Sequence, residues 1–519
     1  MSDKGEKFLT RIFGTALATF LSRILGLLRV MLESRVFGGG AIASAWGFAF
    51  TIPNLFRRIF GEGVLGTALI PIFIQLEAED GEKIARKKLG MVFAVLGIIL
   101  AIIVILVSLI SIFLEGMCES EHFKLGFKLL PLLMPYAFFI CLVGVAQSIL
   151  NCRKVFILPA YGALILNIVL ISTMSVFCYI KKDFNFVLNT MSIMVLVSGV
   201  IHLVMMLILM AYYRVLPDLK FKGVEKKSLF MSLYKTTLPG LIGASVFQIS
   251  MLLDRFFAMF VGAEALPSLN YTERIVYLPI GIVALSFGSV LQVNMAKSVV
   301  AKAEDEVVED LIFGLRHILF LCVPLTFFVM FFRHDIIVAL FYGGNFNLDN
   351  VQATAMAMLF YSMGICFFCS LKLITPLFYS RKDMKTPMNC AIIVLILNVI
   401  LNVILMYPMK QGGLALATVI ASVANNFLQL GIYHKKIHPI PFGRIFKPLG
   451  KAIFATLIGL NIYWISREIN LLDYSPSLRF AVLLIESASF GVIYLGVSFL
   501  IKNSEAKELV NLCFKRFKR

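Results

Sequence analysis

Residues 89–114 read LGMVFAVLGIILAIIVILVSLISIFL and contain no charged side chain. A helix needs about 20 consecutive apolar residues to cross the hydrocarbon core of a bilayer, so this run is long enough for one crossing. The run must be helical, because a lipid-exposed backbone has no water to satisfy its hydrogen bonds. This stretch therefore predicts an integral membrane protein.

The rest of the chain has the same character. Of its 519 residues, 60% are hydrophobic and 15% are charged, whereas a soluble domain is about half apolar and a quarter charged. This composition excludes a soluble enzyme, a nucleic-acid-binding protein and a disordered scaffold. We predict an all-α polytopic membrane protein with 14 transmembrane helices, in the apolar stretches 9–35, 41–75, 89–114, 125–151, 157–180, 187–213, 228–261, 266–297, 309–332, 351–379, 387–407, 413–434, 448–466 and 478–501.

The distribution of basic residues predicts the side on which each loop lies. With the N-terminus inside, the inner loops hold about 30 Lys and Arg and the outer loops about 6, as the positive-inside rule requires. Both termini are therefore expected in the cytoplasm. The net charge of +18 follows from this topology and does not indicate a nucleic-acid partner. The first apolar run is too long for a cleaved signal peptide and is expected to remain as the first span.

An internal duplication predicts two lobes. The dipeptide RK at 153–154 precedes Pro159 by the same spacing as RK at 381–382 precedes Pro387, 228 residues later. Each copy links the fourth span of a six-span unit to its fifth, and an even number of spans gives parallel repeats around a central site, as in transporters. We predict an N-terminal lobe of spans 1–6 (1–214), a C-terminal lobe of spans 7–12 (215–440), and an addition of spans 13 and 14 with a basic tail (441–519).

Two arginines lie deep in the first predicted span. Residues 22–29, SRILGLLR, place Arg23 and Arg29 about 240° apart around the helix axis. Ionisable groups inside a membrane are costly unless they are paired or hydrated, so a wide polar cavity beside this helix is one interpretation. The alternative for Arg29 is a structural ion pair with Glu33, one turn further on. Arg23 has no such acid.

The second predicted span adds another cation. Residues 53–63 read PNLFRRIFGEG, in which Pro53 removes a backbone donor and kinks the helix. Arg58 and Glu62 are four residues apart and can neutralise each other. Arg57 is left without a local acid.

The eighth and tenth predicted spans also carry cations. In residues 270–274, NYTER, Arg274 is adjacent to Glu273 but points in a different direction. Lys372, in the tenth span, faces either the cavity or the membrane surface. Four intramembrane arginines with few acids indicate an anionic cargo, because guanidinium groups bind phosphate or carboxylate at two points and stay charged when buried.

No cofactor is expected. The nine cysteines are scattered, and the CxxC of Cys366 and Cys369 lies mid-span with no second pair, so a metal site is not predicted there. The six histidines form no cluster, and no Walker-type loop is present. The chain is therefore not expected to be an enzyme.

Four blocks of sequence resemble the MurJ group of the MOP (MATE-like) superfamily, the flippases for the peptidoglycan precursor lipid II. The blocks are SRILGLLR (22–29), IPNLFRRIFGEG (52–63) with IP at 70–71, YTERIVYLPIGIVALSFGSVLQ (271–292) and KLITPLFYSRKDMKTP (372–387). The resemblance covers the whole chain, including the two extra C-terminal spans. Together the blocks are specific, whereas any one of them alone would be weak.

The resemblance implies a V-shaped pair of six-helix lobes around a cationic cavity, with a groove for the polyprenyl tail between the last two helices. It implies alternating-access transport of lipid II from the inner to the outer leaflet of the bacterial plasma (inner) membrane. The family's cavity arginines fall on Arg23, Arg29, Arg57 and Arg274, which would bind the diphosphate head. We expect Ser22, Asn54, Glu62, Glu273 and Lys372 to gate or support this site. The partners would be lipid II (undecaprenyl-diphosphate-linked disaccharide-peptide), membrane lipids, and cell-wall synthesis or division proteins.

Two positions depart from the family pattern. Relatives often have Asp where this chain has Val30 and Ser44, which puts the gating contacts in doubt but not the cargo class. Glu33 is the candidate substitute for one of these acids. The predicted eleventh span, 387–407, has no acid to support a sodium site.

Three other functions are alternatives, of which the last two are disfavoured. A flippase for another polyprenyl-diphosphate-linked oligosaccharide would use the same physics with a different head group. A MATE-type drug antiporter is disfavoured, because organic cations would meet a repulsive cavity. A membrane-embedded glycosyltransferase is disfavoured, because the outer loops are short and the six histidines form no cluster.

Overall fold

The structure is a computed structural model that describes residues 3–61, 64–180, 183–218, 220, 248–279, 281 and 284–508. Within these ranges the chain is helical, apart from turns, short connections and one isolated bridge between Gly343 and Phe346. The chain divides into two compact units, Met1–Met259 and Phe260–Arg519. The predicted boundaries at residues 214 and 440 stay a prediction.

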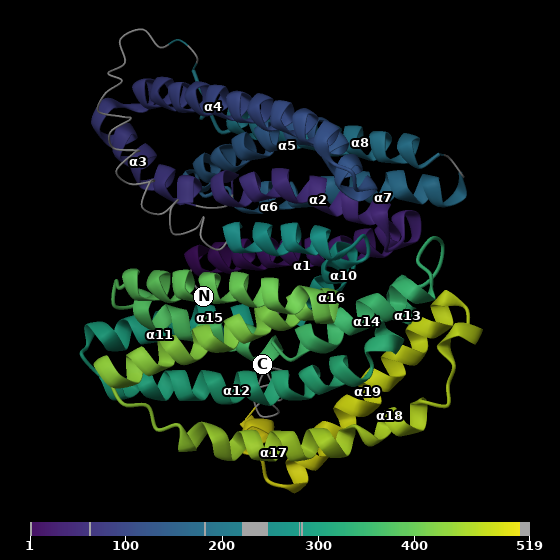
Figure 1. The fold of residues 1–519 in the computed structure, drawn as a ribbon. Coiled ribbons are helices and arrows are strands. Elements are labelled where there is room, and N and C mark those ends of the chain that lie inside the picture. The colour runs from purple at the N-terminus through teal and green to yellow at the C-terminus, as the bar shows by residue number, and fades with distance from the viewer. Residues whose placement is uncertain are drawn as a thin grey trace. The chain divides into compact units, whose positions relative to one another are not determined.

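Unit 1 is organised around one buried helix, α5. α5 packs against α2, α3, α4 and α8 (Figure 1). It carries no charge between Lys128 and Arg153, and its buried side chains occupy all faces, which is the pattern of a core helix. The elements of unit 1 are α1 (Asp3–Phe37), α2 (Ala41–Phe56), η1 (Arg57–Gly61), α3 (Val64–Asp80), α4 (Glu82–Met117), α5 (Glu121–Cys152), α6 (Ile157–Tyr161), α7 (Ala163–Tyr179), α8 (Phe184–Tyr212) and a helical stretch at 248–261.

Unit 2 is organised around α12, which packs against α11, α14, α15 and α17. The Tyr494 hydroxyl of α19 donates to the carbonyl of Phe320 in α12 at 2.7 Å, which ties the last long helix to this core. The elements are α10 (Ala265–Pro279), α11 (Leu285–Val300), α12 (Glu304–Phe331), α13 (Arg333–Phe341), α14 (Leu348–Ser362), α15 (Ile365–Tyr379), α16 (Lys385–Lys436), α17 (Gly443–Gly459), α18 (Asn461–Ser466), η3 (Leu471–Asp473) and α19 (Pro476–Leu500).

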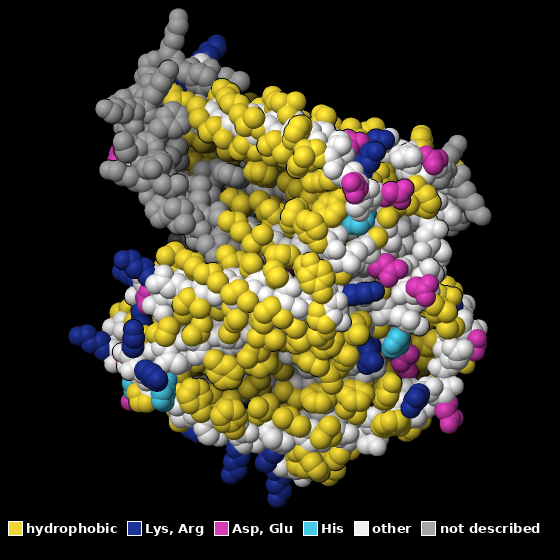
Figure 2. Space-filling model, viewed as in Figure 1, with side chains coloured by type: hydrophobic (Ala, Val, Ile, Leu, Met, Phe, Trp, Pro, Cys, Tyr) yellow, Lys and Arg dark blue, Asp and Glu magenta, His cyan; other side chains and the backbone are white. Residues whose placement is uncertain are grey.

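The structure confirms a polytopic helical membrane protein. Among the described residues, eight helices are long and apolar enough to cross a bilayer, or nine if α14 and α15, bent by 42°, form one span. The exact number of 14 stays a prediction. α4 shows why these helices belong in lipid: Ile98, Ile105 and Phe113 are 61%, 57% and 70% exposed on one long helix. Figure 2 shows hydrophobic side chains covering most of the visible face of each unit.

The second predicted span, 41–75, is not one continuous helix. α2 ends at Phe56, a π-helical turn follows as η1, and α3 begins at Val64. Pro53 lies inside α2 and cannot donate to the preceding turn, so the regular ladder is interrupted just ahead of the arginines. π-helical turns of this kind are frequent at functional sites.

α16 contains a sharp reversal that separates the predicted spans at 387–407 and 413–434. Lys410 has φ 48° and ψ −132°, which is not helical. A methyl group added at Gly413 would lie 2.1 Å from the carbonyl oxygen of Leu405, although eight residues of straight helix would separate the two by about 12 Å. The 52 residues of α16 are therefore two helices that fold back at Lys410.

The RK duplication appears in the structure as a repeated turn. Lys154 and Lys382 both adopt left-handed backbone conformations, with φ of 61° and 60°. The preceding arginines also have equivalent partners: Arg153 lies 3.0 Å from Glu82, the first residue of α4, and Arg381 pairs with Glu304, the first residue of α12. The two units thus close the same kind of turn with the same kind of ion pair.

Glycine at either of these turns is expected to stabilise the protein. Lys154→Gly or Lys382→Gly removes the penalty of a side chain in the left-handed region and should add about 1 kcal/mol to the free energy of unfolding. Lys83→Gly, within α4, is the control and should be destabilising, because glycine is a poor helix former. Thermal unfolding of the detergent-solubilised protein measures both, and a lower melting temperature for both turn variants would contradict the interpretation.

Candidate cationic site

Arg29 of α1 is buried and has a carboxylate partner. It is 5% exposed, its Nε lies 3.5 Å from Oε1 of Glu33, and its guanidinium lies over the ring of Phe50 in α2, 5.3 Å from the centroid. The structural ion pair that the sequence offered as the alternative is therefore present. Nε is buried and makes no hydrogen bond with a described residue, so its interaction with Glu33 is electrostatic. Binding of cargo by Arg29 stays a prediction.

Arg23 lies one and a half turns earlier on α1 and is half-buried. It makes no hydrogen bond or ion pair within the part of the chain that the structure describes. Its neighbour Ser22 acts through the backbone: the Ser22 carbonyl accepts a hydrogen bond of 3.4 Å from the amide of Asn167, which ties α1 to α7. Of Arg23 and Arg29, Arg23 is therefore the one whose charge is not offset locally.

Arg57 begins the π-helical turn and is half-buried. Its Nε donates to Oδ1 of Asn54 at 3.2 Å, and the Asn54 amide in turn donates to the carbonyl of Phe50 at 2.9 Å. Asn54 therefore orients the guanidinium, which is the supporting role that the sequence predicts for it. Arg58 is exposed, and its Nη1 lies 3.0 Å from the sulfur of Met251. Glu62, its predicted partner, lies outside the described residues.

The sequence interpretation set His202 aside, although it lies near Arg57. His202 of α8 is 8% exposed, and the positive charge of Arg57 acts on it electrostatically. Its Nε2 has no hydrogen-bond partner among the described residues, and it fills the space over Gly162, where an added methyl group would lie 2.1 Å from that nitrogen. The signal in the sequence was a titratable residue in a helix that otherwise has none but its terminal tyrosine.

Unit 2 holds the remaining candidates. Arg274 is exposed on α10, whereas the adjacent Glu273 is half-buried and accepts a hydrogen bond of 3.4 Å from the Tyr361 hydroxyl of α14. The two side chains thus point in different directions, as their adjacency predicts. Lys372 of α15 is exposed, and its ammonium has no ion pair with any described residue. Unit 1 thus carries three of the predicted arginines and unit 2 the fourth. Their convergence on one chamber stays a prediction.

The two positions that depart from the family pattern are both buried. Val30 is 3% exposed, and the buried Ser44 hydroxyl donates to the sulfur of Met259 at 3.1 Å. Because both positions are buried, a carboxylate at either one would be poorly hydrated. Glu33, beside Arg29, is the acid that the structure provides in this region.

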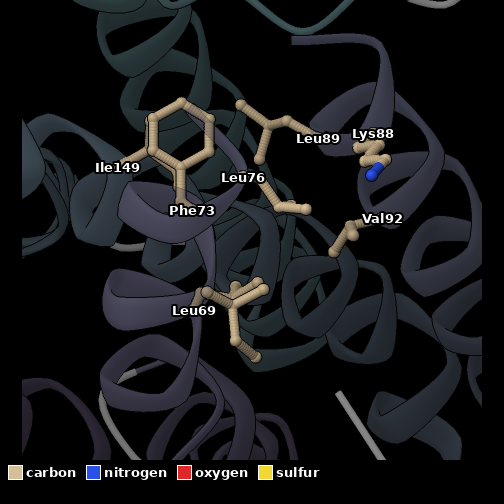
Figure 3. Close-up of a pocket in the computed structure, with 8 residues that line it drawn as sticks. Leu69, Phe73, Leu76, Lys88, Leu89, Val92 and Ile149 are labelled. Carbon is tan, nitrogen blue, oxygen red and sulfur yellow. The ribbon is translucent and has the colours of Figure 1, made fainter. Parts of the chain in front are cut away.

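A small recess in unit 1 does not resemble an anion site. Figure 3 shows apolar side chains of α3, α4 and α5 around it, with Lys88 at one side. The Lys88 ammonium is already bound to Oδ2 of Asp80 at 2.5 Å. No group of three His, Cys, Asp or Glu that could hold a metal ion occurs among the described residues. The recess is therefore a packing feature.

Two units of long apolar helices define a multi-pass helical membrane protein. Two solved structures share this fold. A structure of "Lipid II flippase MurJ, inward closed conformation" superimposes with a TM-score of 0.77 at 24% identity, covering 96% of this chain and 99% of that one. An inward-facing multidrug resistance MATE family transporter of the MOP superfamily gives a TM-score of 0.62 at 15% identity, covering 78% and 93%.

The family model "Lipid II flippase MurJ" matches residues 34–484, and the chain belongs to this family. A curated relative from Rickettsia prowazekii, "Probable lipid II flippase MurJ", is 29% identical over 94% of this chain and 96% of its own length. The "Lipid II flippase MurJ" of Burkholderia cenocepacia is 26% identical over 92% and 95%. The resemblance noted in the sequence is confirmed.

Proposed function

We propose that this protein flips lipid II, the lipid-linked peptidoglycan precursor, from the inner to the outer leaflet of the bacterial plasma membrane. The family match over residues 34–484 carries this proposal, and relatives named as lipid II flippases align over most of the chain. The chain acts as a transporter and not as an enzyme. Its partners are lipid II and membrane lipids, with cell-wall synthesis or division proteins as further candidates.

The proposed binding site for the diphosphate head consists of Arg23, Arg29, Arg57 and Arg274. Arg23 supports this role best, because its charge is not offset by any described residue. Arg57 supports it because Asn54 holds its guanidinium in place, and a preoriented fork loses less entropy on binding phosphate. Arg29 contributes a buried guanidinium whose charge is partly offset by Glu33. Ser22, Glu62, Glu273 and Lys372 are proposed to gate or support the site.

The proposed mechanism is alternating access. The head enters laterally between spans 1 and 8, and the arginines neutralise its charge. The two lobes, 1–214 and 215–440, then rock about the kinked spans, and the site opens outward. A membrane potential that is negative inside favours the outward movement of an anion by about 2.3 kcal/mol per charge per 100 mV. This step needs no nucleotide.

The proposed topology has 14 spans, with both termini in the cytoplasm and a groove for the polyprenyl tail along spans 13 and 14. The reversal at Lys410 supports the count, because it separates two spans within α16. Exposed apolar side chains on the C-terminal helices support the groove: Phe454 of α17 is 53% exposed, and Ile485 and Val492 of α19 are 65% and 71% exposed. The parallel turns at Lys154 and Lys382 support the two lobes.

Reconstitution of the purified protein into vesicles tests the function. Fluorescent lipid II placed in both leaflets should become accessible to an external reagent faster than in protein-free vesicles, and Arg23→Ala should abolish the gain. Preferential movement of another polyprenyl-diphosphate-linked oligosaccharide would replace lipid II as the cargo while keeping the mechanism. No movement of either lipid by folded protein would overturn the proposal.

A further inference from the structure

A glutamate lies inside the last long helix of unit 2. Glu486 is the eleventh residue of α19, about 15 Å along the helix from Pro476. It is only 5% exposed. An ionised carboxylate at this depth in a membrane is strongly unfavourable unless a cation or water compensates it, so an ionisable residue here marks a candidate site.

Among the described residues, no cation pairs with Glu486. Its Oε2 has no hydrogen-bond partner among the described residues, and its carboxyl group interacts with the Ser466 hydroxyl at the end of α18. α13 packs against α19 and carries a second acid, the half-buried Asp335, whose charge acts on Glu486. Two neighbouring carboxyl groups without a cation do not both ionise, because their charges repel and both are poorly hydrated.

The other charged groups of α13 and α19 point elsewhere. Arg333 donates to the carbonyl of Met330 at 2.7 Å, and His334 is exposed. Arg479, two turns before Glu486 on α19, donates to two carbonyls of η3 at 3.0 Å and lies over the ring of Tyr342. Both guanidinium groups are thus occupied by backbone carbonyls.

The charges of α12, α17 and α18 are also far from Glu486. Phe490, one turn after Glu486 on α19, contacts the ring of Phe328 in α12 and lies against Gly459 of α17. These contacts show which parts of α12 and α17 lie at the same depth as Glu486. The charged residues of α12 all lie within 304–317, and those of α17 within 444–451, several turns away. Beyond α18, Arg467 lies over the ring of Trp464.

We propose that Glu486 and Asp335 form a proton-binding site in which the two carboxyl groups hold a proton between α19 and α13. The proton comes from bulk solvent and adds to one carboxylate oxygen, so no other reactant is needed. A proton is favoured over a metal ion, because no group of three ligating side chains is present among the described residues.

The pH dependence of Asp335 agrees with this site. Burial raises the pKa of Asp335 from 3.8 to about 6. A carboxyl group whose pKa rises on folding favours the protonated folded state, so its contribution is complete below about pH 4 and is lost as the pH rises to about 6. Proton binding therefore strengthens the packing of α13 against α19.

Infrared difference spectroscopy of the full-length protein in lipid nanodiscs tests the site. A pH titration should reveal the carbonyl band of a buried protonated carboxylic acid, and Glu486→Gln should weaken that band to the part contributed by Asp335 while leaving the protein folded. Glu468→Gln, at an exposed position just after α18, is the matched control and should keep it. In Asp335→Asn the remaining band, which belongs to Glu486, should disappear at a pH about one unit lower. The pKa of Glu486 falls because the neighbouring negative charge is gone.

Three outcomes would overturn the proposal. One is a band unchanged by Glu486→Gln in folded protein, and another is an unshifted titration in Asp335→Asn. The third is a titration that moves with sodium concentration at constant ionic strength, which would assign the site to a metal cation. None of these readouts depends on transport of lipid, so the proposed function can fail while this site stands.

Discussion

Alanine at Arg23, Arg29, Arg57 or Arg274 is expected to abolish growth of cells depleted of their own lipid II flippase and dependent on this protein. A diphosphate inside a membrane needs charge compensation from the protein, because water is largely excluded. Removing one partner of a desolvated charge pair costs about 2–5 kcal/mol, or roughly 30- to 5,000-fold in affinity. Growth support and the level of each variant in the membrane are the measurements.

A lysine variant distinguishes two-point binding of the diphosphate by a guanidinium from compensation of its charge alone. At Arg57, Asn54 holds the guanidinium by a hydrogen bond of 3.2 Å, so its orientation as well as its charge is set. Arg57→Lys keeps the charge but loses the planar fork, and is expected to remain strongly impaired. Asn54→Ala is expected to be impaired to a smaller extent, because the guanidinium remains but is less well oriented.

Arg58→Ala is the matched control for Arg57→Ala. It removes the same charge from the same turn, but Arg58 is exposed and contacts the sulfur of Met251. We expect near-normal growth from this variant. Growth retained by three of the four arginine variants, at normal membrane levels, would defeat the assignment of the site. Equal lethality of Arg58→Ala would show that the turn is needed for folding rather than for binding.

Arg29 needs a separate comparison, because it is paired with Glu33 and packed on Phe50. If Arg29 only neutralises Glu33, the double variant Arg29→Ala/Glu33→Ala should recover growth, since no unpaired buried charge remains. If Arg29 also binds cargo, the double variant should stay inactive while folding normally. We expect the second result.

Gly413→Ala is expected to have the largest effect on stability. The added methyl group would lie 2.1 Å from the carbonyl oxygen of Leu405, a backbone atom that cannot rotate away. The reversal at Lys410 would have to open, at a cost of about 3 kcal/mol or more. The folded yield and the melting temperature of the purified protein should both fall sharply.

Gly431→Ala is the matched control on the same element. Nothing lies within 4 Å of the position that its added methyl group would take, and alanine is a better helix former than glycine by up to about 1 kcal/mol. This variant should be as stable as the natural chain or more so. Equal melting temperatures for the Gly413 and Gly431 variants would show that α16 does not fold back as described.

Much of the class of this protein could be predicted from the sequence. The uncharged run at 89–114 and the low content of charged residues identify a membrane protein. Exposing a polar backbone or a charged side chain to lipid is unfavourable at each residue separately, so the effect can be read from the local sequence. The arginines of 22–29 and 52–63 could be found because each stands out against its own helix. The pairing of Arg29 with Glu33 was also visible as an alternative, since four residues bring two side chains onto one face.

Only the tertiary structure decided which groups lie next to one another across helices. Phe50 over Arg29, Asn167 bonded to the Ser22 carbonyl, and Tyr361 bonded to Glu273 join residues from different elements, and no local periodicity encodes such contacts. The break after Phe56 and the reversal at Lys410 likewise depend on neighbouring helices that stabilise unusual backbone. Hydropathy and helical spacing act over one or two turns, whereas the charge balance of a buried side chain is set by distant partners.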